Sequence, residues 1–190
     1  MSKKEIIRCS WCGQDPLYQD YHDQEWGKQV KDDGTLFEFL ILESAQAGLS
    51  WITILRRREG YRRAYDNFDY RKIAQYTEAD VERLMQDEGI IRNRLKVKSS
   101  IANARIFMEI QQEFGSFYNY LYSFLPNGEP IINTLENVKE APVTTSVSDA
   151  IAKDLKKRGV KFFGSTICYA YMQAVGMVND HIAACSFRTA

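Results

Sequence analysis

The chain has 190 residues, and 45% of them are hydrophobic, which is enough for one domain with a well-filled core. Its 25 basic and 25 acidic residues give a formal net charge of zero. This overall charge weighs against a tight, non-specific DNA binder and leaves a local basic face open. No apolar run approaches the roughly 20 residues that a transmembrane helix needs. The start MSKKEIIRCS carries charge but no apolar segment, which predicts a cytoplasmic protein without a secretory signal.

The first stretch with chemical character runs from residue 9 to residue 27 and begins CSWC. It holds cysteine, histidine, tryptophan and tyrosine, punctuated by proline and glycine, so we expect loops and short helical turns. Tyr18 and Tyr21 are three residues apart and would share one face of such a turn. Packing in the core and a place in a binding pocket both fit these two tyrosines.

Residues 36–51, LFEFLILESAQAGLSW, have the period of a helix that ends at Gly48. On that helix Glu43 shares an otherwise apolar face. A buried, unpaired carboxylate is unfavourable, so Glu43 lies at the edge of the core, pairs with a cation, or lines a pocket. Leu49 and Trp51 follow at the turn. A carboxylate beside an aromatic ring suits a flat, polar ligand such as a nucleobase, although an amphipathic helix with one peripheral Glu explains the spacing as well.

Two helices joined by a glycine-bearing turn are predicted further along the chain. Before this pair, residues 52–64 are predicted to form a separate arginine-rich helix. Its basic face either is solvated or contacts phosphates. Thr77 to Asp80 forms a capping box for a short helix, and a longer helix covers residues 94–113. The turn DEGIIR at residues 87–92 offers backbone N–H groups to a phosphate. Four basic residues follow there: Arg92, Arg94, Lys96 and Lys98. The motif alone is weak, because most helix pairs are joined by such turns.

The C-terminal half is predicted to be helical, with one long connection. We expect a core helix at residues 116–124, a loop at residues 126–142, and helices at residues 146–157 and 165–175. Ser146 or Ser148 would cap the first of the last two helices. Residues 179–185 would form a last helical turn or two. Strand-like alternation is nearly absent, so the fold class is all-α, in one domain that spans residues 1–190.

Cysteine and histidine residues gather at the two ends of the chain. His181 and Cys185 are four residues apart, a spacing that places both on one face of a helix. The N-terminal segment offers Cys9, Cys12 and His22. Four nitrogen and sulfur ligands would make a closed, structural zinc site that ties the two ends together. Spacing leaves the fourth ligand open between Cys12 and His22, and buried thiols with ordinary histidines are the alternative.

Five stretches resemble the DNA-3-methyladenine glycosylase I family, constitutive bacterial alkylation-repair enzymes of the helix-hairpin-helix glycosylase superfamily. They are RCSW around residue 9, residues 15–27, residues 36–55, residues 87–96 and residues 148–181, and they cover nearly the whole chain. The resemblance implies a helix-hairpin-helix fold whose N- and C-terminal segments are joined by one structural zinc ion per chain. It also implies a monomer that acts on DNA and not on membranes.

The resemblance assigns roles to individual residues. The family's zinc ligands correspond to Cys9, His22, His181 and Cys185. Cys12 departs from the family pattern and could compete as a ligand. The base pocket corresponds to Trp11, Tyr18, Tyr21, Glu43 and Trp51. The hairpin around Gly89 and Arg92, together with Lys96, would contact the DNA backbone. Leu49 would fill the base stack when the damaged nucleotide leaves it.

The implied activity is hydrolysis of the N-glycosidic bond of 3-methyladenine, and more weakly of 3-methylguanine, in alkylated double-stranded DNA by base flipping. Free base and an abasic site would be the products, and Glu43 would read the base edge. No lysine stands at the position expected of a lyase nucleophile, so strand cleavage is not expected. Two other interpretations stay open: a zinc-stabilised DNA-binding module without catalysis, and a glycosylase that also accepts 7-methylpurines.

Overall fold

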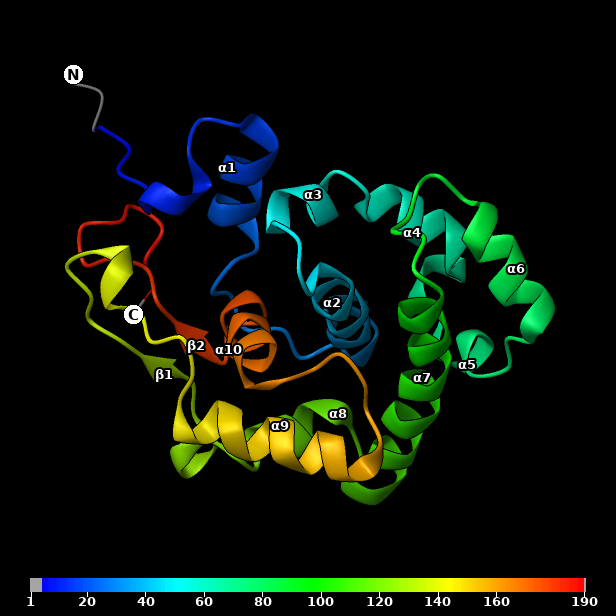
Figure 1. Cartoon of the computed structure of the whole chain (residues 1–190). Coiled ribbons are helices and arrows are strands. Elements are labelled where there is room, and N and C mark those ends of the chain that lie inside the picture. The colour runs from blue at the N-terminus through cyan, green and yellow to red at the C-terminus, as the bar shows by residue number, and fades with distance from the viewer. Residues whose placement is uncertain (1–4, 190) are drawn as a thin grey trace.

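The computed structural model describes residues 5–189, which form ten α-helices and a two-stranded sheet (Figure 1). The helices are α1 (Pro16–Gln24), α2 (Asp33–Gln46), α3 (Trp51–Leu55), α4 (Arg58–Ala64), α5 (Tyr70–Ile73), α6 (Glu78–Gln86), α7 (Arg94–Phe114), α8 (Phe117–Tyr122), α9 (Ser146–Arg158) and α10 (Ser165–Ala174). The strands are β1 (Ile131–Ile132) and β2 (Val178–Asn179). Residues 1–4, part of the stretch used above to predict the absence of a secretory signal, lie outside the described residues. None of the described helices is long and apolar enough to cross a membrane.

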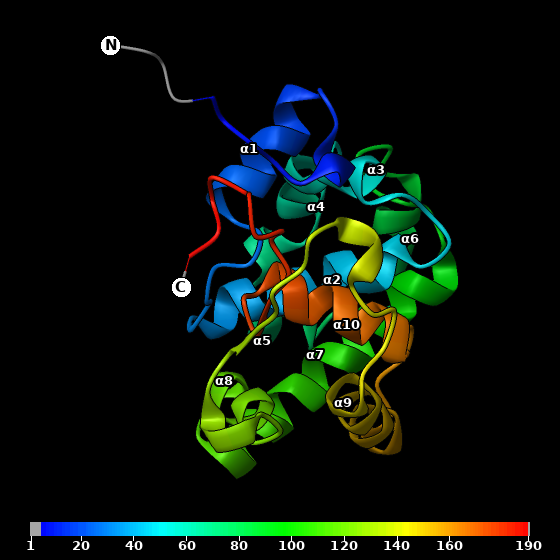
Figure 2. The same ribbon diagram turned by 90° about the vertical axis from the view of Figure 1, so that its left-hand side faces the viewer.

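Helix α2 lies at the centre of the molecule beside α10, with α1, α3, α7 and α9 around this pair (Figures 1 and 2). Asp32 caps α2 by accepting a hydrogen bond from the Thr35 N–H at 2.7 Å. Leu36, Phe37 and Leu42 are fully buried although they point in different directions around the helix. An α-helix that is apolar all round is a core helix. Glu43 is therefore carried into the interior and not, as one of the sequence-based alternatives had it, to the edge of the core.

Helices α6 and α7, which flank the glycine-bearing turn at residues 87–93, each begin with a side-chain cap. Thr77 and Asp80 form the predicted capping box at the start of α6. Asn93 caps α7 by accepting a hydrogen bond from the Lys96 N–H at 3.1 Å. Because these short-range bonds satisfy N–H groups that lack intrahelical partners, the boundaries of both helices follow from local sequence.

The same turn rests on α4 through a contact between two glycines. A Cβ atom on Gly60 would lie 2.3 Å from the Gly89 carbonyl oxygen, so only glycine fits at residue 60. The Gly89 N–H donates to the Asp87 carboxylate at 2.7 Å, and the Ile91 N–H donates to the Tyr61 hydroxyl at 3.2 Å. The hairpin is therefore held by α4 as well as by its own two helices.

Two predicted helix boundaries are wrong. The helix expected over residues 52–64 is interrupted at Arg56 and Arg57, and the chain forms α3 and α4 instead. This turn redirects the chain so that α4 reaches the hairpin, a tertiary requirement that helical periodicity does not record. Helix α9 is capped by Thr145 and not by Ser146 or Ser148, since the Thr145 hydroxyl accepts from the Ser148 N–H at 3.2 Å.

Residues 179–185 do not form the predicted helical turns. Strand β2 pairs in parallel with β1, with Ile131 opposite Val178, and an isolated bridge joins Leu135 to Ile182. The backbone groups of the C-terminal segment are satisfied by the loop expected at residues 126–142, so a helix is not needed there. Strands of two residues are too short to show an alternating pattern. The chain ends meet here as well: the Ser186 N–H donates to the Ile7 carbonyl at 2.8 Å.

Candidate functional site

A cavity of about 200 Å³ opens among α1, α2, α3 and α10. All five residues that the sequence assigned to a pocket line it: Trp11, Tyr18, Tyr21, Glu43 and Trp51. Trp11 lies on a single turn of 3-10 helix (Ser10–Cys12), and Tyr18 and Tyr21 share the inner face of α1. Glu43 comes from α2, and Trp51 is the first residue of α3. Four separate segments thus place these side chains around one space.

The Glu43 side chain is buried, with 3% of its surface exposed. Its Oε2 atom has no hydrogen-bond partner among residues 5–189. Burial raises the pKa of this carboxyl to about 8, which favours its protonated form at neutral pH. Burial, with a smaller contribution from Glu43, also raises the pKa of Tyr21 above its ordinary value. A buried acid with an unsatisfied oxygen facing a cavity indicates a site for a polar ligand.

Two indole N–H groups beside this acid are also unsatisfied. Trp11 Nε1 and Trp51 Nε1 are buried and find no acceptor within the described part of the chain. The Trp51 ring stacks on Phe39, with centroids 6.3 Å apart and planes at 19°, and Trp11 meets Tyr18 edge-on at 5.0 Å. These contacts fix the orientation of both indoles. The cavity therefore offers aromatic walls, two donors and one acid, a set that suits a flat heterocycle with hydrogen-bonding edges.

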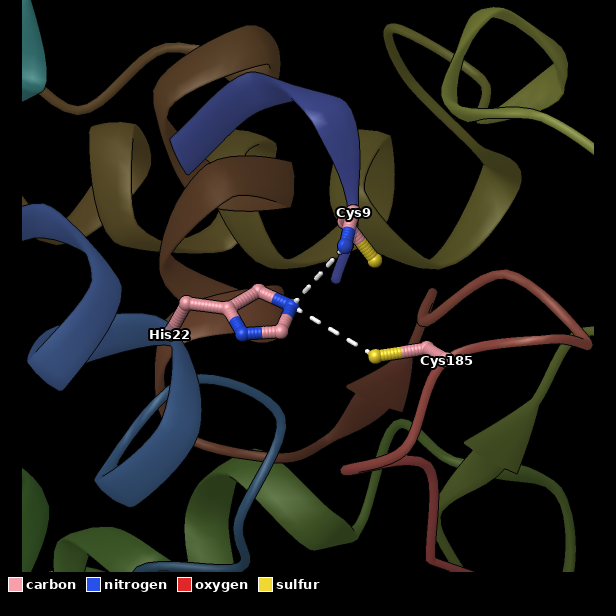
Figure 3. Close-up of side chains that lie close together, drawn as sticks. All are labelled: Cys9, His22 and Cys185. Atoms are coloured by element: carbon pink, nitrogen blue, oxygen red, sulfur yellow. Dashed lines mark hydrogen bonds between the residues drawn. The ribbon is translucent and has the colours of Figure 1, made fainter. Parts of the chain in front are cut away.

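Cys9, His22 and Cys185 form a buried cluster in which the three candidate ligand atoms lie within 4.8 Å of one another (Figure 3). The distance from His22 Nε2 to Cys185 Sγ is 3.6 Å. In a tetrahedral zinc site a nitrogen and a sulfur ligand are separated by roughly 3.5 Å, given the usual bond lengths to zinc. The cluster joins the N-terminal and C-terminal segments, so these side chains fit a metal that clips the two ends together.

The surroundings of His22 hold its ring in the form that binds metal. His22 Nδ1 lies 2.8 Å from Asp23 Oδ1, and Arg8 forms an ion pair with the same carboxylate through three hydrogen bonds. Burial lowers the pKa of His22, which favours the neutral ring with a proton on Nδ1 and a lone pair on Nε2, where it accepts from the Cys9 N–H at 3.4 Å. Burial raises the pKa of the Cys9 thiol to about 12. Metal binding would therefore release protons from the thiols.

His181 and Cys12 lie outside this three-residue cluster. The His181 ring is 4.9 Å from the His22 ring, its Nδ1 lies 2.9 Å from Asn179 Oδ1, and its buried Nε2 has no partner among the residues described. An orphaned ring nitrogen beside three candidate ligands fits a fourth ligand. Cys12 instead donates its S–H to the Cys9 carbonyl at 3.1 Å. Of the two ligands that spacing left open, the structure brings His22 into the cluster and not Cys12.

The residues predicted to contact a DNA duplex lie on two turns and at the start of α7. Leu49, 39% exposed, lies between α2 and α3, next to Gly48 with a φ of +82°. Gly89 and the exposed Arg92 lie between α6 and α7. Lys96 lies near the start of α7, and its ammonium group donates hydrogen bonds to backbone carbonyls at the end of α2.

A sequence model of the family described as methyladenine glycosylase matches residues 11–189. The chain belongs to the methyladenine glycosylase family. It is 51% identical over 178 residues to DNA-3-methyladenine glycosylase 1 of Escherichia coli (strain K12), which covers 94% of this chain and 95% of that one. The chain is 50% identical to a crystal structure of 3-methyladenine DNA glycosylase I, with a TM-score of 0.93. The match covers 96% of this chain and 100% of that one. The chain is also 34% identical to 3-methyladenine DNA glycosylase I from Staphylococcus aureus, whose structure describes the basis of 3-methyladenine recognition, with a TM-score of 0.93. This match covers 98% of this chain and 99% of that one.

The pocket of this methyladenine glycosylase contains further polar residues that the sequence analysis missed. Gln173 of α10 and Asp180, which follows β2, both line the cavity. Asp180 Oδ2 accepts hydrogen bonds from Gln173 Nε2 and from the Tyr169 hydroxyl, each at 2.7 Å. The position of Asp180 directly before His181 was a usable signal, because a residue next to a predicted metal ligand is placed near the clip. Gln173 carried no signal, since one Gln in a helix is ordinary.

Proposed function

We propose that the protein is a DNA repair enzyme that hydrolyses the N-glycosidic bond of 3-methyladenine, and more weakly of 3-methylguanine, in alkylated double-stranded DNA. Free base and an abasic site are the products. The observation that carries the proposal is the aromatic cavity in which Glu43 and the indoles of Trp11 and Trp51 lack hydrogen-bond partners among residues 5–189. The relatives from Escherichia coli and Staphylococcus aureus, both named for 3-methyladenine, support the choice of base.

The chemistry of the substrate fits a pocket without a strong acid. Methylation at N3 leaves adenine cationic while it is attached to the sugar, and the base departs as a neutral molecule. No proton has to be delivered for the bond to break. The faces of Trp11 and Trp51 attract a cationic ring more strongly than a neutral one. Normal purines hold a stronger glycosidic bond, so the same pocket leaves them attached.

Glu43 has two roles in this proposal. A cationic base in the cavity lowers the pKa of Glu43 from its value of about 8, because an opposite charge nearby favours the carboxylate. The carboxylate then accepts a hydrogen bond from the exocyclic amine of the base. Its charge also stabilises the positive charge that develops on the deoxyribose as the bond breaks. Glu43 is thus the catalytic residue as well as the residue that reads the base.

Reaching this pocket requires the damaged nucleotide to leave the duplex. Leu49 lies on the turn that connects the helix of Glu43 to the helix of Trp51, and its side chain is 39% exposed. An exposed aliphatic group at this place suits the space that the nucleotide vacates. Gly89 and Arg92, on the α6–α7 turn, would contact the DNA backbone through N–H groups and positive charge.

One zinc ion per chain would be held by Cys9, His22, His181 and Cys185. With four protein ligands the site is closed and leaves no position for a reactive water, so its role is structural. The ion would join the segment that carries Trp11 to the segment that carries Asp180, and both of these residues line the cavity. The metal would therefore hold two walls of the base pocket in place.

Base release from methylated duplex DNA, with the freed bases separated by chromatography, tests the function. We expect 3-methyladenine in the released fraction and 7-methylguanine left in the DNA. Glu43→Gln should keep the fold and DNA binding and lose most of the release, whereas Glu59→Gln, a surface control whose side chain is 69% exposed, should behave as the parent protein. Release of both bases would overturn the proposed selectivity. Absence of release from a folded, zinc-loaded protein would favour a DNA-binding module.

A further inference from the structure

Lys96 is the one basic residue at the start of α7 whose charged group turns inward within the described structure. Its Nζ donates to the Ala45 carbonyl at 2.8 Å and to the Ala47 carbonyl at 2.6 Å. The neighbouring cations behave differently: Arg94 pairs with Glu82 at 2.6 Å, and Lys98 pairs with Glu78 at 3.0 Å. Those ion pairs lie on the surface between α6 and α7, whereas Lys96 reaches across to α2.

A cation would stabilise the C-terminal end of α2. The last carbonyls of a helix lack intrahelical partners and carry the negative end of the helix dipole. The last turn of α2 contains no basic residue. Lys96 supplies the missing charge from α7, and its partial burial lowers the pKa of the amine because the charged form loses hydration. Two bonds from one ammonium group to two carbonyls fix the position of that helix end.

The carbonyls that Lys96 contacts stand directly before the turn that carries Leu49. Gly48 has a φ of +82°, a conformation that glycine adopts without strain, so it allows the chain to turn here. The turn is closed by the Leu49 N–H, which donates to the Gln46 carbonyl at 2.6 Å, and by Gln46 Nε2, which donates to the Leu49 carbonyl at 3.2 Å. All of these bonds are made to the end of α2, whose position Lys96 sets.

We propose that Lys96 is a positioning residue that fixes the Leu49 turn to the helix whose N-terminus forms the DNA-binding hairpin. Contact of the hairpin with the DNA backbone then determines where Leu49 enters the base stack. Lys96 therefore acts on discrimination between damaged and normal duplex and not as a phosphate contact. The inference rests on the proposed function, because it assumes that the α6–α7 turn and Leu49 both face DNA.

The test compares Lys96→Met with Lys98→Met, a control that removes the same charge from the same helix end. Affinity is measured for an undamaged duplex and for a duplex with a tetrahydrofuran abasic site, at several salt concentrations. We expect Lys96→Met to lower the preference for the abasic duplex about tenfold, as the loss of charge-assisted hydrogen bonds at the wedge would do. Its affinity for undamaged duplex and its salt dependence should stay unchanged, and Lys98→Met should keep the preference.

Loss of a phosphate contact would give a different result. Both affinities would fall by the same factor, and the slope of log affinity against log salt would become shallower by about 0.9. That outcome would overturn the proposal. A parent protein with no preference for the abasic duplex and no base release would instead refute the proposed function itself.

A double-mutant cycle separates positioning from general destabilisation. If Lys96 acts through Leu49, the variant with both Lys96→Met and Leu49→Ala should show the same preference as Leu49→Ala alone. Additive losses would contradict the coupling. Lys96→Arg, which keeps a charge with several donors, should restore part of the preference, and its failure to do so while folded and bound to undamaged duplex would also count against the proposal.

Discussion

Replacing Glu43 by glutamine should change how the stability of the protein depends on pH. Burial raises the pKa of Glu43 to about 8, from an ordinary value of 4.5 that the unfolded chain retains. Between these two values the folded protein holds a proton on Glu43 that the unfolded chain has released. Stability contributed by this proton is fully present below pH 4.5 and is lost as the pH rises toward 8. The amide of the Glu43→Gln variant does not titrate, so the variant lacks this dependence.

The size of the effect follows from the distance between the two pKa values. Each unit of difference is worth about 1.4 kcal/mol, so the 3.5 units between 4.5 and 8 amount to about 5 kcal/mol. The free energy of unfolding of Glu43→Gln, minus that of the parent protein, should therefore rise with pH by about 1.4 kcal/mol per unit. At pH 4.5 the Glu43→Gln variant is expected to be slightly less stable than the parent protein. The N–H donors of its side-chain amide would be buried there without hydrogen-bond partners.

Urea denaturation of both proteins at half-unit steps from about pH 4.5 to about pH 9 measures this difference. Every other titrating group is common to the two proteins, so the subtraction isolates Glu43. A Glu43→Gln difference that stays constant across the range would refute the reasoning, because it would mean that the carboxyl is solvated or paired in the folded protein.

Three further predictions concern the clip and the hairpin. Cys185→Ser should reduce the zinc content below one per chain in elemental analysis and lower the free energy of unfolding by at least about 2 kcal/mol, and full stability without metal would contradict the clip. Gly60→Ala should destabilise the protein by about 1–3 kcal/mol in urea titrations and weaken duplex binding, since its methyl group would lie 2.3 Å from the Gly89 carbonyl oxygen. Arg92→Ala should make the salt dependence of duplex binding shallower by about 0.9, and an unchanged slope would exclude a phosphate contact there.

The tertiary structure corrects the helical argument for the candidate metal site, and it groups Cys9, His22 and Cys185. His181 and Cys185 were paired because four residues span one helical turn. The segment is instead a strand followed by turns, held by the parallel pairing of Val178 with Ile131. Two strands of two residues, far apart in the chain, leave no periodic trace in the sequence. The ligand types were readable because cysteine and histidine are few in this chain, whereas their geometry depended on a partner strand.

The orientation of the Lys96 side chain likewise depends on a segment that is distant in the chain. Its place beside a glycine-bearing turn suggested a phosphate contact, and the presence of three other cations nearby supported that interpretation. In the structure its ammonium group donates to the end of α2, which motivates the positioning role proposed above. Whether a lysine faces solvent or caps a distant helix depends on which helix packs beside it, and local sequence does not record that.

The sequence by itself determined the elements that depend on neighbouring residues. The capping box of Thr77 and Asp80, the end of α2 before Gly48 and the course of α7 follow from bonds and conformations within a few residues. Through the family resemblance it also named five side chains that line one cavity in the structure. Only the tertiary structure decided that Glu43 is buried and that its pKa is raised, because burial depends on segments far away in the chain. The same packing brought Gln173 and Asp180 to the pocket.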